Sequence, residues 1–309
     1  MKVIFLGSGE FSLTVLKAVR ASAHEVVAAV AQPDKVNARN GKTVFSPVKS
    51  YALAEGLTLF QFEKINNELE ALRPLNADIM LTSSYGQLLS REVLALCPHG
   101  VINTHASLLP AYRGAAPIQS AILNGDEVIG TTIMRTEFEM DTGDIILQRS
   151  MRLNGTENSE ECFAILAELS ASAAVEALDS IEKGTATYTP QDNSRASYCR
   201  KFVKEDGKMD FKLTATELTR RVRAFYGFPG TYCDTPNGRL KVLEAAVSDK
   251  EFADGECGEV LEADKHGITV RCGGGSAVVF LRVQGEGGKA MSARDYLLGK
   301  KLPAGTVLG

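Results

Sequence analysis

The first half of the chain alternates between short apolar segments and longer amphipathic ones. Segments of four or five residues rich in Val, Ile, Leu and Ala predict buried strands. They lie at residues 3–6, 26–30, 57–60, 78–82 and 100–103. Between them, residues 11–20 and a segment that begins at Ser46-Pro47 predict helices, with Ser46 as the N-cap. Apolar strands separated by helices predict a mostly parallel sheet covered on both faces.

The second half changes its pattern near residue 188. Before that point, strands are predicted at 131–134 and 144–147, joined by a turn, and a long helix at 159–181. The polar residues 188–195 predict a linker. A helix at 213–225 follows, with a Thr-x-x-Glu capping pattern at Thr214 and Glu217. Short strands separated by glycine turns then lie at 239–243, 258–261, 267–271 and 277–281.

These patterns predict two domains of different class. We expect an α/β, Rossmann-like domain with a mostly parallel sheet at residues 1–188 and a linker at 189–205. A small OB-like antiparallel β-barrel domain is expected at 206–309. Ligands of open parallel sheets bind at the carboxyl ends of the strands. The first domain is therefore where we expect chemistry.

Composition and charge narrow the class of protein. Of the 309 residues, 44% are hydrophobic and 23% are charged, as in ordinary globular proteins. No apolar run is long enough to cross a bilayer, and the six cysteines show no CxxC spacing. We therefore expect a cytoplasmic protein with no membrane partner. We also expect it to be a monomer. The net charge of −4 means that a nucleic-acid partner would have to be bound by local patches.

The strongest candidates for chemistry follow the strand at 100–103. Asn103 and His105 are two residues apart, so in an extended segment they face the same side, and Ser107 would follow them. Asp141 and Asp144 lie in the predicted turn between two later strands. An amide, an imidazole and a carboxylate together suit acyl transfer. Two alternatives stay open: a polar cluster that only stabilises a loop, and a metal site formed by His105, Asp141 and Asp144, which lacks a second histidine.

Two other motifs are weaker. Gly7-x-Gly9 after the first strand resembles a dinucleotide fingerprint, but Ser12 stands at the third glycine position and no acidic residue ends the second strand. A nicotinamide dehydrogenase is therefore disfavoured.

Two groups of cations could contact phosphates. They are Lys35, Arg39 and Lys42 in a polar loop, and Arg220, Arg221 and Arg223 near the end of a predicted helix.

The central motif is similar to the signature of the folate-dependent formyltransferases. It reads Asn103-x-His105-x-Ser107-Leu108-Leu109-Pro110-x-x-Arg113-Gly114-Ala115-Ala116-Pro117-Ile118. Further segments follow in family order: Gln32-Pro33-Asp34, Ser46-Pro47-Val48-Lys49, Ser84-Tyr85-Gly86, Met140-Asp141-Thr142-Gly143-Asp144, Arg223-Ala224-Phe225 and Gly288-Lys289-Ala290-Met291-Ser292-Ala293. The C-terminal motifs resemble those of the family members that formylate methionyl-tRNA.

This resemblance implies an enzyme that transfers a formyl group from 10-formyltetrahydrofolate to the amino group of methionyl initiator tRNA, without a metal. It implies catalytic roles for Asn103, His105 and Asp141. The implied folate-binding residues are Ser84, Tyr85, Gly86, Gln87, Leu88, Ser107, Leu108, Leu109, Pro110 and Asp144. The loop with Lys35, Arg39 and Lys42 corresponds to one that enters the acceptor end of tRNA, and Arg220, Arg221 and Arg223 would contact tRNA from the second domain.

Some positions depart from the family pattern. Gly7-Ser8-Gly9-Glu10-Phe11 replaces the usual Gly-Thr-Pro-Glu-Phe, and Tyr226-Gly227 separate Arg223-Ala224-Phe225 from the following proline segment. The catalytic triplet is unaffected. Three rivals follow from the same residues: a formyltransferase acting on a sugar amine or glycinamide ribotide, a formyltetrahydrofolate hydrolase, and a non-catalytic RNA-binding protein.

Overall fold

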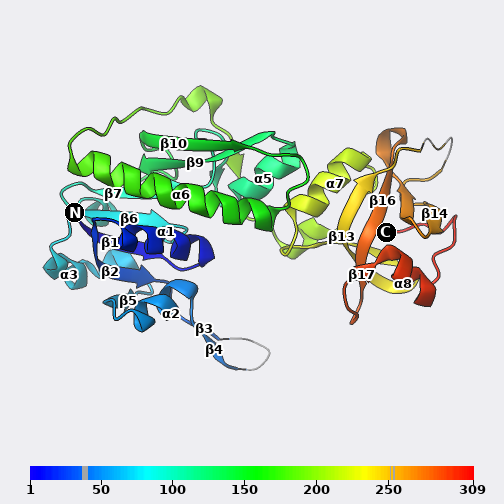
Figure 1. The fold of residues 1–309 in the computed structure, drawn as a ribbon, viewed down its shortest axis with the longest axis horizontal. Helices are drawn as coiled ribbons and strands as arrows, with labels where there is room; N and C mark the ends of the chain where they lie inside the picture. Colours follow the sequence, from blue (N-terminus) through cyan, green and yellow to red (C-terminus); the bar gives the residue numbers. More distant parts are fainter. Residues whose placement is uncertain (37–40, 251, 253–254) are drawn as a thin grey trace. The chain divides into compact units, whose positions relative to one another are not determined.

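The computed structural model describes residues 1–36, 41–250, 252 and 255–309 (Figure 1). They divide into two compact units. Unit 1 comprises Met1–Pro117, Val128–Arg152 and Phe163–Cys199, and unit 2 comprises Ile118–Glu127, Leu153–Cys162 and Arg200–Gly309. The predicted division into a Rossmann-like domain at 1–188, a linker at 189–205 and a C-terminal domain at 206–309 stays a prediction.

A seven-stranded sheet forms the centre of unit 1. Its strands are β1 (Lys2–Gly7), β2 (Glu25–Ala31), β5 (Leu59–Gln61), β6 (Ile79–Ser83), β7 (Val101–His105), β9 (Val128–Arg135) and β10 (Ile145–Arg152), in the order β10-β9-β7-β6-β1-β2-β5. The five strands β7, β6, β1, β2 and β5 pair in parallel. β9 pairs antiparallel with β7 on one side and with β10 on the other. The predicted mostly parallel sheet is confirmed.

Helices cover both faces of this sheet. On one face lie α1 (Glu10–Ala21) and α6 (Ser159–Glu182), where the rings of Phe11 and Phe163 meet with centroids 5.3 Å apart. On the other face, Ile4 and Leu6 pack into a core with the short helices α3 (Leu69–Leu72) and α4 (Arg91–Leu94). Because β1 is buried on both faces, it carries an unbroken apolar run rather than an alternating pattern.

Smaller elements complete unit 1. Helix α2 (Pro47–Ala54) begins as predicted, since the Ser46 side chain accepts a hydrogen bond from Lys49 N. The others are β3 (Lys35–Val36), β4 (Thr43–Val44), η1 (Ile65–Asn67), η2 (Arg73–Leu75), β8 (Arg113–Gly114), η3 (Asn193–Arg195) and β11 (Tyr198–Cys199). β3 pairs with β4 as a hairpin, and β11 pairs in parallel with β8. The polar residues 188–195, predicted as a linker, therefore belong to unit 1.

Unit 2 is built on an antiparallel sheet in the order β12-β13-β16-β15-β14, with β17 beside β16. These strands are β12 (Thr231–Thr235), β13 (Gly238–Val247), β14 (Val260–Asp264), β15 (Gly267–Arg271), β16 (Ala277–Gly285) and β17 (Met291–Ser292). The end of the chain closes the gap between the outer strands, because Leu308 N donates to Gly258 O and Asp234 N donates to Gly309 O. This closure gives the predicted sheet a barrel-like form.

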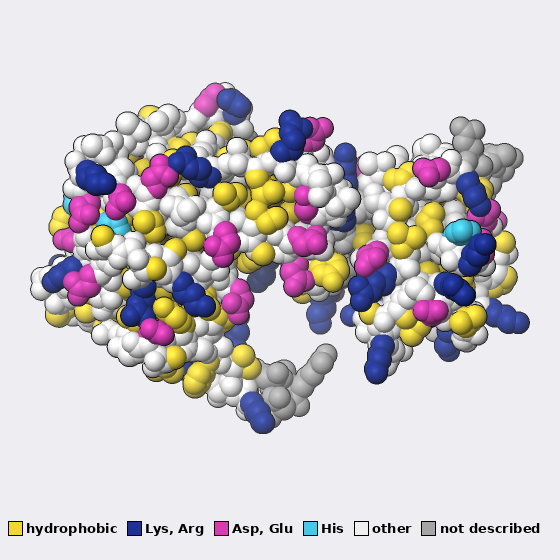
Figure 2. All heavy atoms as spheres, viewed as in Figure 1, with side chains coloured by type: hydrophobic (Ala, Val, Ile, Leu, Met, Phe, Trp, Pro, Cys, Tyr) yellow, Lys and Arg dark blue, Asp and Glu magenta, His cyan; other side chains and the backbone are white. Residues whose placement is uncertain are grey.

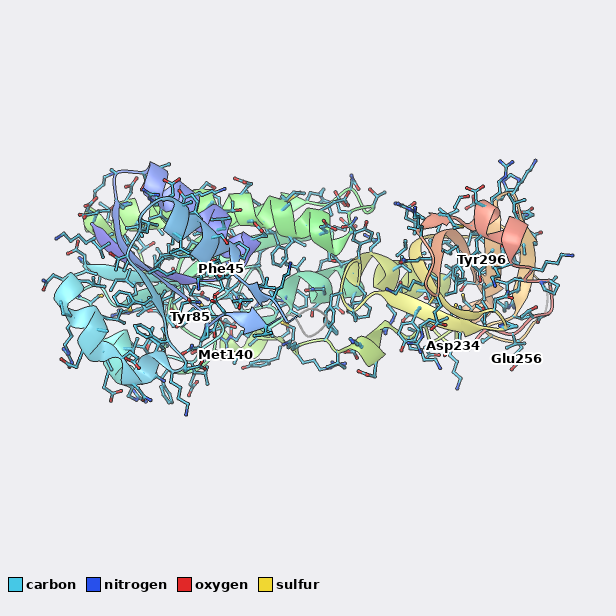
Figure 3. The ribbon with its side chains drawn as sticks, turned by 90° about the horizontal axis from the view of Figure 1, so that it is seen from below. Phe45, Tyr85, Met140, Asp234, Glu256 and Tyr296 are labelled. Carbon is cyan, nitrogen blue, oxygen red and sulfur yellow. The ribbon has the colours of Figure 1, made fainter. Side chains whose placement is uncertain are left out.

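Helices α7 (Ala215–Ala224) and α8 (Ala293–Gly299) pack on the sheet of unit 2. The predicted capping box of α7 is confirmed, since Thr214 Oγ1 accepts from Glu217 N and Glu217 accepts from Thr214 N. Tyr296 of α8, labelled in Figure 3, joins the buried core. The remaining elements are α5 (Pro117–Asn124), η4 (Lys204–Gly207) and η5 (Gly273–Gly275). Within the described residues, no helix combines the length and apolar character needed to span a bilayer.

Candidate active site

Asn103 and His105 lie at the carboxyl end of β7, where the sheet changes from parallel to antiparallel pairing. β7 pairs in parallel with β6 and antiparallel with β9, so both side chains leave a strand that is fixed on its two edges. Asn103 is half-buried, and its Oδ1 accepts a hydrogen bond of 2.7 Å from Thr82 Oγ1. The hydrogen bond fixes the side-chain amide, and the NH2 group remains a potential donor.

His105 is buried, with both ring nitrogens near oxygen atoms. Its Nε2 lies 2.9 Å from Tyr112 O, and its Nδ1 lies 3.7 Å from Asp141 Oδ2. A carbonyl oxygen can only accept, so Nε2 carries a proton and Nδ1 faces the carboxylate. The ring is therefore oriented so that a second proton, on Nδ1, would be stabilised by Asp141.

Asp141 lies in the turn between β9 and β10, which includes Met140 in Figure 3. Its φ of 55° is in the left-handed region, and its Oδ2 accepts a hydrogen bond of 2.8 Å from Gly114 N. This hydrogen bond holds one oxygen of the carboxylate in place. Asp144 is half-buried three residues later, and its main-chain oxygen accepts from Arg135 N.

The path of this turn is held tightly from two sides. A Cβ on Gly143 would lie 1.8 Å from Arg135 O, so only glycine fits there without a shift of the main chain. On the other side, the Gln191 side chain donates to Asp141 O at 2.9 Å and to Gly143 O at 2.8 Å. The main-chain geometry of the turn thus sets the position of the carboxylate.

The segment 107–110 is anchored to the antiparallel strands. Thr132 Oγ1 donates to Ser107 O at 2.7 Å and accepts from Leu109 N at 3.1 Å, while Gln148 Nε2 donates to Leu109 O at 3.0 Å. Ser107 and Leu109 are buried, and the other two predicted folate contacts, Leu108 and Pro110, are half-buried. The segment is therefore fixed directly after β7.

Residues 84–88 form the loop after β6. Ser84 and Gly86 are exposed with positive φ values of 48° and 82°, and Leu88 is 70% exposed. Gln87 is held from both ends of its amide, because it donates to a main-chain oxygen and accepts from a main-chain amide in the segment 62–65. Tyr85 (Figure 3) is buried, and burial raises its pKa to about 12. The loop presents main-chain groups and an apolar side chain beside the end of β7.

Of the loop cations, Lys35 begins β3 and is exposed, and Lys42 is exposed just before β4. Arg39 lies outside the described residues. On the face shown in Figure 2, cationic and acidic side chains are interspersed over each unit. Exposure of the two lysines is compatible with phosphate contact, and their role in tRNA binding stays a prediction.

The arginines of α7 contact main-chain oxygens of unit 2. Arg221 donates to Asp206 O and Arg223 donates to Glu157 O at 3.1 Å. Burial lowers the pKa of both Arg221 and Arg223 below its usual value. Arg220 makes a longer contact of 3.4 Å with Asn124 O. All three are half-buried, and their part in tRNA binding is untested.

Several residues that hold the site were not predicted from their position. Gln191 falls in a polar stretch expected to be a linker, and Tyr112 contributes only a carbonyl, so neither carries a signal in a single sequence. Thr132 could have been noticed, because a hydroxyl within a buried apolar strand needs a partner. Buried polar residues inside strands are thus a second signal for a site.

Comparison with known proteins gives the family. A formyl transferase model matches residues 1–178, and a model of the formyl transferase C-terminal domain matches residues 201–301. The crystal structure of an N-formyltransferase from Helicobacter canadensis, in complex with folinic acid and dTDP-3-aminofucose, has a TM-score of 0.70. The match covers 91% of this chain and 98% of that chain at 17% identity, a likeness of fold.

Two relatives match almost end to end, and both are methionyl-tRNA formyltransferases. The protein of Lachnospira eligens is 38% identical over 315 residues, covering 100% of both chains. That of Anaeromyxobacter dehalogenans (strain 2CP-C) is 40% identical over 303 residues, covering 97% of each. Together with the two domain matches, this full-length likeness shows that the chain belongs to the methionyl-tRNA formyltransferase family.

Proposed function

We propose that the protein transfers a formyl group from 10-formyltetrahydrofolate to the free amino group of methionyl initiator tRNA, giving N-formylmethionyl-tRNA for translation initiation. The observation that carries this proposal is the arrangement of Asn103, His105 and Asp141 at one end of the sheet, in a chain that belongs to this family. The amide, imidazole and carboxylate are all oriented by hydrogen bonds to neighbouring strands and turns.

The mechanism follows from what each side chain can donate or accept. The donor supplies a formyl carbonyl whose oxygen gains negative charge as the amine attacks the formyl carbon. The tetrahedral intermediate then collapses: the bond from the formyl carbon to the folate nitrogen breaks, and that nitrogen takes up the proton that the amine lost, so that tetrahydrofolate leaves. Asn103 stabilises that charge through its side-chain NH2 group, and His105 does so as a cation or acid. Asp141 stabilises the charged ring and accepts, directly or through water, the proton that the amine loses. With Nε2 already donating to Tyr112 O, Nδ1 is the nitrogen of His105 that would carry the second proton of the cation, facing the carboxylate of Asp141.

The folate site is proposed between the loop 84–88 and the segment 107–110. Two features of the structure fit a flat heteroaromatic ring there: main-chain groups exposed at Ser84 and Gly86, and the exposed side chain of Leu88. The loop follows β6, and the strand order of the sheet reverses between β1 and β6. Ligands of such sheets bind at this point of reversal. Asp144, half-buried after the catalytic turn, completes the proposed set.

The acceptor is proposed to bind through local cations. Lys35, Arg39 and Lys42 would contact phosphates at the acceptor end of tRNA, and Arg220 would contact tRNA from unit 2, with Arg221 and Arg223 supporting it. Such contacts release counterions, so affinity for tRNA should fall as salt rises. We place the reaction in the cytoplasm and propose that the enzyme acts as a monomer.

One assay tests the proposal. The protein is given 10-formyltetrahydrofolate with methionyl initiator tRNA, glycinamide ribotide or an amino sugar in parallel, and uncharged initiator tRNA serves as the control without an amine. We expect formyl transfer to methionyl-tRNA alone. Transfer to the sugar amine or ribotide would move the chain to a small-amine formyltransferase, and release of formate in every reaction would indicate a hydrolase.

A further inference from the structure

We infer that Gln191 is a positioning residue for Asp141 and that the buried Arg113 fixes the orientation of Gln191. This inference rests on the proposed function, because it concerns how the proposed catalytic carboxylate is placed. It assigns a role to a residue of a polar stretch that lies 50 positions from Asp141 along the chain.

The Gln191 amide links the turn at residues 141–143 to the buried side chain of Arg113. Its Nε2 donates to Asp141 O at 2.9 Å and to Gly143 O at 2.8 Å, so both of its hydrogens are used on the catalytic turn. Its Oε1 accepts from Arg113 Nε at 3.1 Å and from Arg113 Nη2 at 2.7 Å. The side chain is therefore a bridge with a fixed donor end and a fixed acceptor end.

Arg113 decides which end of the amide faces the turn. The side chain is 2% exposed, and a buried cation is costly unless its donors are satisfied. Its further hydrogen bonds go to Asn193 Oδ1 at 2.8 Å and Tyr198 OH at 3.3 Å. Because a guanidinium only donates, it can face the amide oxygen and not the NH2 group. The NH2 group of Gln191 must then point to the turn.

The turn needs this support because of its main-chain conformation. Asp141 has a φ of 55°, a left-handed conformation that is unfavourable for a non-glycine residue and persists only where its surroundings hold it. Gly114 N holds the carboxylate and Gln191 holds the main chain of the same residue. Without the hydrogen bond from Gln191, the turn could relax and move Oδ2 away from His105 Nδ1, which lies 3.7 Å from it.

The test compares Gln191→Glu with Asn193→Asp. Both place a carboxylate beside Arg113, but only Gln191→Glu removes the donors to the turn and puts an oxygen against two carbonyls. We expect Gln191→Glu to lower kcat for formyl transfer by ~10- to 100-fold, with KM for 10-formyltetrahydrofolate and methionyl-tRNA within about twofold. Asn193→Asp should keep kcat within about twofold of the wild type. Equal losses in the two variants would overturn the inference, since added charge alone would then explain them.

A double-mutant cycle with Asp141→Asn separates positioning from folding. If Gln191 acts through Asp141, Gln191→Glu should reduce single-turnover rates by less than about threefold once the carboxylate is absent. A full loss in both backgrounds would mean a general structural role and would overturn the inference. If Asp141→Asn is severely impaired but Gln191→Glu is not, the positioning role alone fails. If Asp141→Asn keeps wild-type kcat, the catalytic assignment in the proposed function fails.

Discussion

The carboxyl end of β7 in unit 1 and the last turn of α7 in unit 2 both carry polar side chains that are at least half-buried. At the end of β7, strand pairing satisfies the main chain. The Asn103 side chain accepts one orienting hydrogen bond from Thr82, and the His105 ring donates one to Tyr112 O. On α7, Arg221 and Arg223 instead donate to main-chain carbonyls, those of Asp206 in η4 and of Glu157 just before α6.

The difference shows what makes a polar cluster suitable for chemistry. The His105 ring has one nitrogen fixed by a carbonyl and the other turned toward a carboxylate, so it can still exchange a proton. A guanidinium that stabilises a carbonyl inside the fold gains little by leaving it, because the carbonyl would lose its partner. We therefore expect substitutions at β7 to change rate at constant stability, and Arg221 to change stability at constant rate.

The largest effect is expected from Asn103→Ala and His105→Ala. Removing one group that stabilises developing charge typically lowers kcat on the order of a hundredfold or more. Binding of a folate analogue and the urea midpoint should change little for Asn103→Ala, because the residue is only half-buried. Single-turnover formylation of methionyl-tRNA measures the loss.

Thr104→Ser is the matched control for this pair. Thr104 lies between the two residues and faces the opposite side of β7, where its hydroxyl donates to Ser83 Oγ at 2.9 Å. The serine keeps that hydroxyl, so kcat should remain near the wild-type value. Near wild-type kcat in both alanine variants would remove Asn103 and His105 from the mechanism.

The next effect concerns the two carboxylates of the turn. Asparagine tolerates the left-handed conformation at position 141, so Asp141→Asn should fold and lose only the charge. We expect kcat to fall by ~10- to 1,000-fold, as for loss of a general base or an electrostatic partner. Asp144→Asn, with kcat measured in the same way, should be milder. A larger loss at Asp144 would show that the wrong member of the pair was assigned.

The same comparison explains what could be predicted from the sequence. The alternation of apolar strands and helices predicted the sheet, because burial on both faces demands it, and the spacing of Asn103 and His105 predicted a shared face. The boundary of β5 was predicted two residues early, because only Leu59 and Phe60 of that run pair with β2. Short strands carry too few residues for the pattern to define their ends.

Other parts of the candidate site could not be predicted, for two physical reasons. Gln191 is brought to Asp141 by the long-range bridge between Thr189 and Ile145, which no local pattern records. Charge clusters such as Arg221 and Arg223 reveal charge but not exposure, since a long side chain can turn inward to a main-chain carbonyl. Sequence spacing therefore predicts which groups share a strand face, but not which loops come to meet them.

Arg221→Met tests the other side of the comparison. The variant keeps the packing of the stem and leaves Asp206 O without its donor, so we expect the free energy of unfolding to fall by about 1–2 kcal/mol. The dependence of KM for methionyl-tRNA on salt should stay parallel to that of the wild type. An unchanged urea midpoint with a flatter salt dependence would instead give Arg221 a direct contact with tRNA.

The loop cations should behave in the opposite way. Replacing Lys35, Arg39 and Lys42 with Ala should change stability by less than about 0.5 kcal/mol, as for most surface substitutions. KM for methionyl-tRNA should rise, and the log–log slope against salt should flatten by ~1 for each phosphate that a cation no longer neutralises. Affinity for a folate analogue, measured by fluorescence titration, is the control. Equal loss of folate and tRNA binding would make the loop structural.

The smallest expected effect concerns the carboxylate of Asp206, whose main-chain oxygen receives Arg221. Hydrogen bonds from Arg200 Nη1 at 2.8 Å and Val203 N at 2.7 Å stabilise the ionised carboxylate, and its pKa falls from 3.8 to about 2. A folded-state pKa below the unfolded value adds stability above pH 4, and this is lost as pH falls from about 4 to 2. Because Arg200 is 65% exposed, solvent screening leaves a contribution of about 1 kcal/mol to the free energy of unfolding.

Urea unfolding of Asp206→Asn at pH 7, 5, 4 and 3 measures this contribution. The free energy of unfolding should be lower than that of the wild type by a constant amount down to pH 4, and the difference should narrow below pH 4. The exposed Glu205→Gln control should show no deficit at pH 7. A deficit in Asp206→Asn that persists unchanged at pH 3 would mean that the contact between Asp206 and Arg200 stabilises unit 2 through packing rather than through charge.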